Sequence, residues 1–331
     1  MTGAPSARAA RDAPPGVTPY RAPRWLPGGH AQTIYPVLFA PRPRVVYRRE
    51  RWATPDGDFI DVDWAGAASE DAPLVALFHG LEGSSRSHYA LSLMDAVINA
   101  GWRGVVVHFR GCSGEPNRLP RAYHSGDSAE IDWIVRRLAP IAPALHVTGV
   151  SLGANALLRW LGERGGEAVG LVASAAAVSA PLDLMAAGNA LDQGFNMVYT
   201  RHFLRTMRRK AIAKLARHPD IYRQDAVARA CTLREFDNVV TAPLHGYRDT
   251  DDYWTRASSK PVLRHIAVPT LVLNARNDPF LPAGALPSRA DTSSAVVLEQ
   301  PEEGGHVGFV SGTFPGRLTW LPQRLMDHFR H

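Results

Sequence analysis

The chain has 331 residues, of which 45% are hydrophobic and 21% are charged, and its formal net charge is +6. This length fits one large α/β domain or two small ones, and the hydrophobic content is sufficient for a sizeable core. No apolar run approaches the ~18 residues of a membrane-spanning helix, and the N-terminus lacks the apolar region of a secretory signal, so we expect neither. The two cysteines, Cys112 and Cys231, fit neither a disulfide framework nor a metal-ligand cluster, and they predict a reducing, cytoplasmic location.

The N-terminal segment, residues 1–24, is rich in Ala, Pro and Arg. Such a composition offers little apolar surface to bury and predicts a flexible arm. The Arg-rich, acid-poor start also resembles an organelle transit peptide, but its repeated prolines disfavour the amphipathic helix of such peptides. We expect residues 25–331 to form a single domain.

The positive net charge raises the question of a nucleic-acid partner, but the basic residues are mostly scattered. The densest basic cluster spans residues 201–217, where apolar side chains recur at helical spacing: Phe203, Leu204, Met207, Ala211 and Leu215. This pattern predicts an amphipathic helix with a basic face. A solvated face is the simpler interpretation, and peripheral contact with an anionic membrane surface or an acidic substrate is the alternative. No zinc-finger spacing or RNA-binding aromatic motif accompanies the charge, so we expect no nucleic-acid partner.

The segment after the arm begins with a loop at residues 25–30, which we expect to pack on the core. Alternating apolar and polar residues at 44–51 and 59–64 flank Pro55-Asp56-Gly57, a hairpin signal. The next run, residues 73–78, is continuously apolar, as expected of a strand covered on both faces.

Apolar runs and helical patterns alternate along most of the remaining chain. Further strands are expected at residues 104–109, 145–150, 169–177, 269–274 and 295–300. Helices are expected at residues 125–138 and 318–329, after the turn at residues 149–153 (156–161), and around the apolar residues Leu91, Met94, Val97 and Ile98. This alternation predicts an α/β fold with a mostly parallel central sheet flanked by helices on both faces. Residues 182–259 show helical periodicity and little strand signal. We interpret them as a helical cap insertion over the carboxyl edge of the sheet, where it would supply the walls of a substrate pocket.

The strand at residues 145–150 runs into Gly149-Val150-Ser151-Leu152-Gly153, which fits the G-x-S-x-G nucleophile elbow. A serine at the tip of such an elbow has a strained backbone conformation. Gly149 and Gly153 avoid a clash there because glycine has no Cβ. The pentapeptide alone also occurs in ordinary turns. Its position between an apolar strand and a helix favours a catalytic Ser151.

A serine hydroxyl needs a base to take its proton and a third group to orient that base. In enzymes with a nucleophile elbow, the catalytic residues follow one another along the chain in the order Ser, then Asp or Glu, then His. Asp278 directly follows the strand at 269–274, and His306 follows the strand at 295–300. Taken singly, Asp278 could be a turn aspartate before proline and His306 a surface histidine. Their order and placement after strands predict a triad of Ser151, His306 and Asp278.

Attack on a carbonyl also requires donors for the oxyanion. The Leu152 amide is one candidate, and the Leu81 amide, in the loop after the strand at 73–78, is the other. Gly80 allows the close turn of this loop. We expect His79 to orient the loop by hydrogen bonding rather than to react.

Other polar clusters are better interpreted structurally. Cys112-Ser113 lies in a glycine-rich loop with no basic partner, and the aspartates at 249, 251 and 252 lack the spacing of a calcium loop. We expect no metal ion and no cofactor.

Several stretches carry a family resemblance. They are Leu26-Pro27-Gly28-Gly29-His30-Ala31-Gln32-Thr33, His79-Gly80-Leu81-Glu82-Gly83-Ser84-Ser85, the loop from Phe109 to Glu115 with Asn117-Arg118 and Tyr123-His124-Ser125-Gly126, Leu244-His245-Gly246-Tyr247 with Asp251-Asp252-Tyr253-Trp254, and Asn274-Ala275-Arg276-Asn277-Asp278-Pro279-Phe280. With them the chain, from about Trp25 to its end, resembles the YheT-like branch of the α/β-hydrolase fold. Relatives in that group include carboxylesterases and lipases that act on acylglycerols or phospholipids. The resemblance implies the triad Ser151, Asp278 and His306, and hydrolysis of carboxylic esters without a cofactor.

These observations predict a carboxylesterase or lipase acting on a small-molecule or lipid acyl ester. A thioesterase or amidase on the same triad remains the alternative, as does a catalytically silent lipid-binding or scaffold protein of this fold. The apolar residues Phe195, Met197, Val198 and Tyr199 suggest an acyl site, with simple packing as the other interpretation. The sequence does not indicate an oligomeric state.

Overall fold

A computed structural model describes residues 18–66 and 69–331, so residues 1–17 of the predicted arm lie outside the described residues. Its centre is an eight-stranded sheet in the order β1-β2-β4-β3-β5-β6-β7-β8. The strands are β1 (Arg48–Ala53), β2 (Phe59–Gly66), β3 (Leu74–Phe78), β4 (Arg103–Val107), β5 (Leu145–Val150), β6 (Ser174–Val178), β7 (Thr270–Leu273) and β8 (Val296–Glu299). The hairpin β1–β2 and the pair β2–β4 are antiparallel, whereas β4, β3 and β5 to β8 run parallel. The predicted mostly parallel sheet is confirmed.

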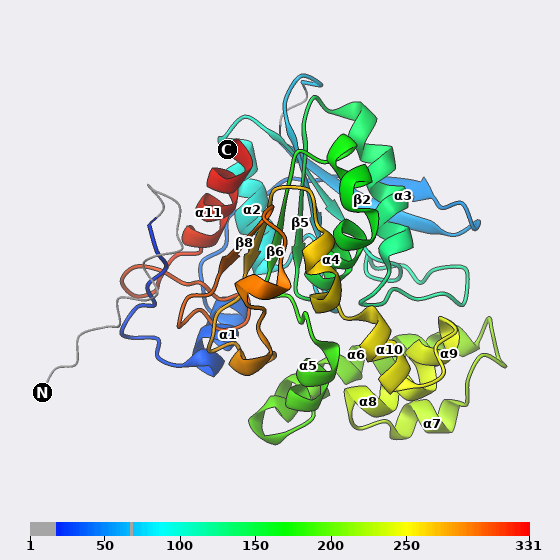
Figure 1. The fold of residues 1–331 in the computed structure, drawn as a ribbon. Coiled ribbons are helices and arrows are strands. Elements are labelled where there is room, and N and C mark those ends of the chain that lie inside the picture. Colours follow the sequence, from blue (N-terminus) through cyan, green and yellow to red (C-terminus); the bar gives the residue numbers. More distant parts are fainter. Residues whose placement is uncertain (1–17, 67–68) are drawn as a thin grey trace, which may run out of the picture.

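Helices cover both faces of this sheet (Figure 1). The helices outside the insertion are α1 (Gly29–Leu38), α2 (His88–Asn99), α3 (Ser128–Leu138), α4 (Leu152–Arg164) and α11 (Trp320–Arg330). Helices α2 and α11 pack on one face, and α3 and α4 on the other. Strand β3 shows why: Leu74, Ala76 and Phe78 enter one core, while Val75 and Leu77 enter the opposite core. A strand buried on both faces reads as a continuous apolar run.

Residues 182–259, here called the helical insertion, lie between β6 and β7 beside the carboxyl ends of the strands (Figure 1). The insertion contains α5 (Leu184–Leu191), α6 (Met197–Leu215), α7 (Gln224–Arg229), α8 (Leu233–Phe236), a π-helix (Asp237–Thr241), α9 (Ala242–Leu244) and α10 (Thr250–Ala257). It has an apolar cluster of its own, to which Phe280 of the following loop also contributes. The sheet and the insertion therefore meet at the edge where functional loops of parallel sheets gather.

Two predictions near the N-terminus were wrong in part. Residues 25–30 are not all loop, because α1 begins at Gly29. Gly28 before this helix and Pro36 within it are atypical of a helical sequence, which is why the helix was not predicted. The boundary of the arm at residue 24 lies too late in the chain. Tyr20 is buried, packs edge-on against Phe309, and donates its hydroxyl to the Val310 carbonyl oxygen at 2.8 Å.

The strand predicted at residues 169–177 begins later than expected, at Ser174. Val169 belongs to a 3-10 turn (Gly165–Gly170) after α4, and Leu171, Val172 and Ala173 form the irregular link from this turn to the sheet. Within residues 18–66 and 69–331, none of the helices combines the length and apolar character that a bilayer crossing requires.

Candidate active site

The nucleophile elbow joins β5 to α4. Ser151 lies between them with φ 54° and ψ −119°, a conformation that a non-glycine residue adopts only under strain. A Cβ on Gly149 would approach the Gly153 carbonyl oxygen to 2.5 Å, and one on Gly153 would collide with the Phe78 carbonyl oxygen. Only glycine fits at these two positions. The predicted strand, tight turn and helix are therefore present at Ser151.

The structure brings the three predicted triad residues into one hydrogen-bonded chain. The Ser151 hydroxyl lies 2.9 Å from His306 Nε2, and His306 Nδ1 lies 2.8 Å from Asp278 Oδ2. The second carboxylate oxygen of Asp278 accepts the Phe280 N–H at 2.8 Å, which fixes the carboxylate plane. The Phe280 ring stacks on the His306 imidazole with centroids 3.9 Å apart. In this geometry the imidazole can accept the serine proton while Asp278 holds its opposite nitrogen.

Helix α1 positions the loops that hold the acid and the base. Gln32 is fully buried, and its side-chain oxygen accepts a hydrogen bond from Asn277 Nδ2 at 2.9 Å. Asn277 in turn accepts the Gly305 N–H at 2.9 Å, and Thr33 Oγ1 accepts the His306 N–H at 2.9 Å. Motif reasoning did not assign these roles. The only signal was that Gln32 and Thr33 stand in a stretch that shares the family resemblance.

Both predicted oxyanion donors lie beside Ser151. A Cβ on Gly80 would lie 3.1 Å from the Ser151 Cβ, so the loop after β3 packs directly against Ser151. Leu81, Leu152 and Ser151 line the same cavity. In the part of the chain that the structure describes, neither Leu81 nor Leu152 donates its N–H to a protein acceptor. Two such amides can donate to an oxygen that acquires negative charge next to Ser151.

His79 orients one of these amides. Its Nδ1–H donates to the Gly80 carbonyl oxygen at 2.7 Å, and its Nε2 accepts the Phe109 N–H at 3.1 Å. Burial lowers the pKa of His79 to about 3, so the ring is neutral. The Gly80 carbonyl and the Leu81 N–H belong to one planar trans peptide and point in opposite directions. By holding the carbonyl, His79 sets the direction of the Leu81 N–H.

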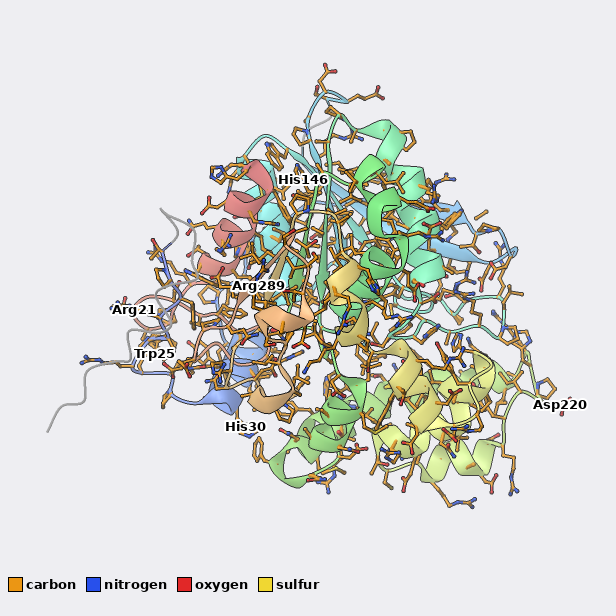
Figure 2. The ribbon with its side chains drawn as sticks, viewed as in Figure 1. Arg21, Trp25, His30, His146, Asp220 and Arg289 are labelled. Carbon is orange, nitrogen blue, oxygen red and sulfur yellow. The ribbon has the colours of Figure 1, made fainter. Side chains whose placement is uncertain are left out.

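A cavity of about 820 Å³ extends from Ser151 into the helical insertion. Its apolar walls come mainly from the insertion and include Leu184, Leu191, Phe203, Met207, Phe236, Val240 and Trp254. Such a volume accommodates a small organic ligand or an acyl chain. The residues suggested from sequence for this role lie elsewhere. None of the four lines the cavity: Phe195 and Val198 are exposed, and Tyr199 hydrogen-bonds His30 of α1, which is labelled in Figure 2.

The basic helix is only partly solvated. Lys214 of α6 donates to the carbonyl oxygens of Pro120 and Arg121 at 2.7 and 2.9 Å, and Lys210 pairs with Glu82 at 2.8 Å. The interpretation of the whole basic face as solvent-exposed was therefore wrong for these two lysines. They connect the insertion to the loops around the site, while Arg201 and Arg205 remain exposed.

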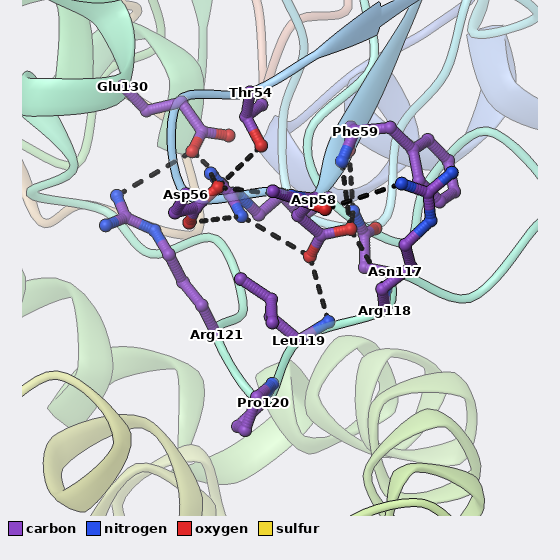
Figure 3. A network of polar contacts seen from close by, with 12 residues as sticks. Thr54, Asp56, Asp58, Phe59, Asn117, Arg118, Leu119, Pro120, Arg121 and Glu130 are labelled. Carbon is purple, nitrogen blue, oxygen red and sulfur yellow. Dashed lines mark hydrogen bonds and ion pairs between the residues drawn. The ribbon is translucent and has the colours of Figure 1, made fainter.

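A buried polar network holds residues 117–121, the segment whose carbonyl oxygens Lys214 contacts (Figure 3). The carboxylate of Asp58 is fully buried and accepts Asn117 Nδ2 and the N–H groups of Arg118 and Leu119 at 2.9, 2.9 and 3.1 Å. Burial raises the pKa of the Asp58 carboxyl, but these hydrogen-bond donors lower it by more. The pKa of Asp58 therefore lies below its ordinary value. Arg110 joins the same network and lies 2.7 Å from Glu130. The hairpin turn thereby holds residues 117–121 in place.

The other polar side chains considered from the sequence have surroundings typical of structural roles. Burial raises the pKa of the Cys112 thiol to about 11, which keeps the thiol protonated and unreactive at neutral pH. Asp249 caps α10 by accepting the Asp252 N–H at 2.8 Å. Among the described residues, no group of three or more His, Cys, Asp or Glu side chains is placed to hold a metal ion.

Comparison with known proteins gives consistent matches. A model of the family described as "alpha/beta hydrolase fold" matches residues 73–313, a range that contains Ser151, Asp278 and His306. The YheT protein of Escherichia coli (strain K12) is 40% identical, over 90% of this chain and 89% of its own length. Phospholipase ABHD3 of Homo sapiens is 32% identical, over 90% of this chain and 75% of its own length. The solved structure of the Pyrococcus furiosus esterase Pf2001 shares the fold with a TM-score of 0.55 at 16% identity, covering 88% of this chain and 98% of that chain.

Proposed function

The chain belongs to the alpha/beta hydrolase fold family, in its YheT-like branch, and on that premise we propose that it is a serine hydrolase of carboxylic esters. The observation that supports this most strongly is the hydrogen-bonded chain from Ser151 through His306 to Asp278, placed at the end of a large apolar cavity. In this proposal the helical insertion acts as the cap of a single domain that comprises residues 25–331, to which Tyr20 of the preceding segment also packs.

The proposed reaction has two halves. Ser151 Oγ attacks the acyl carbonyl while His306 Nε2 takes its proton, and the Leu81 and Leu152 amides donate to the oxyanion. Collapse of the tetrahedral intermediate breaks the bond to the alcohol oxygen, which receives the proton from His306. The acyl group is then esterified to Ser151. Water attacks this ester with His306 again as base, and the carboxylic acid leaves with Ser151 restored.

We propose that the acyl group occupies the apolar part of the cavity, between α5, α6 and α10. The volume of about 820 Å³ and the walls formed by Leu191, Phe236 and Trp254 suit a lipid acyl chain. The name of the human relative, a phospholipase, agrees with an ester of this class. A thioester or amide would use the same triad and is the second candidate for the cleaved bond.

The site of action proposed here is the cytoplasm, in peripheral contact with an anionic membrane surface. Val198, Arg201 and Arg205 are exposed at spacings of three and four residues, so they share one face of α6. An apolar residue among cations is the composition that anionic lipid surfaces attract. Both cysteines are free, as a reducing compartment requires.

Two measurements separate these proposals. A fluorophosphonate probe should label the protein, with the adduct mapped to Ser151 by mass spectrometry; an unlabelled protein, or an adduct on another residue, would contradict the triad and favour the silent scaffold. A panel of esters graded by acyl length, with matched thioesters and amides, identifies the preferred bond. We expect esters to be cleaved fastest, and a higher kcat/KM for thioesters or amides would overturn that part of the proposal.

A further inference from the structure

One ion pair connects the helical insertion to the candidate oxyanion loop. Lys210 Nζ of α6 lies 2.8 Å from Glu82 Oε2 and 2.9 Å from Oε1, so it contacts both carboxylate oxygens. The two residues are 128 positions apart in the sequence and line the same cavity as Ser151. The Glu82 side chain is 12% exposed and the Lys210 side chain 39%, so the carboxylate is mostly shielded from water while the ammonium is half-exposed.

Glu82 directly follows Leu81, the candidate oxyanion donor. Its backbone has φ 56°, a left-handed conformation that costs energy for a residue with a Cβ. Two contacts with Tyr123 hold it there: the Glu82 N–H donates to the Tyr123 hydroxyl at 2.9 Å, and that hydroxyl donates to Glu82 Oε1 at 3.0 Å. The carboxylate therefore has two donors, Tyr123 from the domain and Lys210 from the insertion.

The rest of the loop depends on the domain alone. The Gly80 N–H donates to the Tyr89 hydroxyl at 3.0 Å, and the Gly80 carbonyl accepts from His79 and from the Gly83 N–H. The Gly83 bond closes a turn with Leu81 and Glu82 at its centre. Within this turn, Glu82 is the residue that contacts α6, so it is the residue through which the position of α6 can act on the Leu81 peptide.

We propose that Lys210 and Glu82 are positioning residues that hold the Leu81 amide in donor geometry when the insertion is closed over the site. This inference rests on the proposed function and deepens it, because it makes the oxyanion hole depend on the cap. Without Lys210, the carboxylate of Glu82 keeps one donor, the Tyr123 hydroxyl, although its side chain is only 12% exposed. An underpaired, mostly buried charge favours movement toward water. Such movement would release the strained backbone at Glu82 and turn the adjoining peptide.

A different role for Lys210 makes a different kinetic prediction. A cation in the cavity could bind an anionic group of the substrate directly. In that case its loss would raise KM for anionic substrates and leave kcat on a neutral ester unchanged. A positioning role instead lowers kcat on every ester, because the oxyanion forms in each reaction.

The test compares Lys210→Met, Lys210→Arg, Glu82→Gln and the double variant Lys210→Met/Glu82→Gln with the wild type. Steady-state kcat and KM are measured on a neutral short-chain ester, with active sites counted by fluorophosphonate titration so that unfolded protein does not contribute. Arg223→Met is the matched control, since Arg223 forms an exposed ion pair with Asp225 in the insertion and does not line the cavity. Thermal unfolding of each variant reports the stability of the fold.

We expect Lys210→Met to lower kcat about 10-fold or more with KM within about 2-fold, since complete loss of one oxyanion donor costs about 10²–10³ in rate. Lys210→Arg should recover part of this loss. The double variant should be no slower than the slower single variant, because both remove one interaction. Arg223→Met should match the wild type.

An unchanged kcat in Lys210→Met and in Glu82→Gln would overturn the inference while leaving the proposed function intact. A KM effect confined to anionic esters would overturn it in favour of substrate binding. If Lys210→Met does not fold, Glu82→Gln and Lys210→Arg decide the matter by the same kinetic criterion. A wild-type protein that neither binds the probe nor cleaves esters would overturn the proposed function, and the inference would fall with it.

Discussion

The Thr33 hydroxyl accepts the backbone N–H of His306 at 2.9 Å, although the two residues are 273 positions apart in the chain. Thr33 is buried in α1, the helix that the sequence did not predict. The contact fixes the backbone of the loop from which the imidazole reaches Ser151. The N-terminal helix is therefore part of the support of the site, and its removal should affect catalysis.

This support can be tested at Thr33. Thr33→Val keeps the shape of the side chain but leaves the His306 N–H without its acceptor, a loss of about 1–3 kcal/mol. We expect kcat to fall about 10-fold, because a displaced imidazole accepts the serine proton less well. Thr33→Ser retains the hydroxyl and should stay close to the wild type. Equal losses in both variants would indicate a packing effect instead.

His79 and His306 should differ in how much activity their loss removes. His79→Ala frees the Gly80 carbonyl and with it the Leu81 amide, so we expect kcat to fall by up to the ~10²–10³ of one oxyanion donor. His306→Ala removes the general base and should cost more, about 10⁴-fold or more. Initial rates of hydrolysis of an activated ester compare the two variants. A His79→Ala variant as inactive as His306→Ala would assign His79 a larger role than orientation.

The rate of hydrolysis should fall toward acid pH. A protonated imidazole cannot accept the Ser151 proton, so a histidine base requires kcat/KM to rise from acid toward neutral pH. Asp278→Asn should lower kcat about 10³–10⁴-fold at every pH, because the amide favours the wrong tautomer. A kcat/KM that stays flat from acid to alkaline pH would rule out a histidine base.

The stability of the fold should also depend on pH, through Asp58. The pKa of this carboxyl is lower in the folded protein, because the donors around Asn117 outweigh the effect of burial. A group of this kind stabilises the fold above its unfolded pKa of about 3.9, and the contribution is lost as pH falls through the folded value. The free energy of urea unfolding should therefore decrease from pH 6 to pH 3. In Asp58→Asn the protein should be less stable at pH 6 and show a shallower decrease.

The control for Asp58 is Asp220→Asn, at an exposed position in the outer part of the insertion (Figure 2). Its stability curve should follow the wild type at each pH. If Asp58→Asn shows the same slope as the wild type, the acid sensitivity resides in other carboxylates.

Local patterns were sufficient for most of the sheet and for identifying the three side chains that the structure joins by hydrogen bonds. β3 and β5 are apolar throughout because both faces are buried, and the order of Ser151, Asp278 and His306 along the chain follows from where functional loops leave a parallel sheet. These features are encoded within short windows of sequence. They can be read without knowledge of distant contacts.

The features that were missed depend on contacts between distant segments. Helix α1 has glycine at its start and Pro36 within it, and its role comes from loops more than 200 residues later. The direction of Lys210 toward Glu82 follows from the way α6 lies on the domain, which periodicity does not determine. An amphipathic pattern predicts which face of a helix is apolar, but not which of its lysines meets a buried carboxylate.

The central claim is that Ser151 is the nucleophile of an ester hydrolase, and its most direct test is the rate of Ser151→Ala on an activated acyl ester. Ser113→Ala, a serine in the glycine-rich loop outside the hydrogen-bonded chain, is the control. We expect Ser151→Ala to lose at least about 10⁴-fold in kcat while its thermal unfolding stays close to the wild type, and Ser113→Ala to retain activity. A Ser151→Ala protein that cleaves the ester at near wild-type rate would contradict the claim.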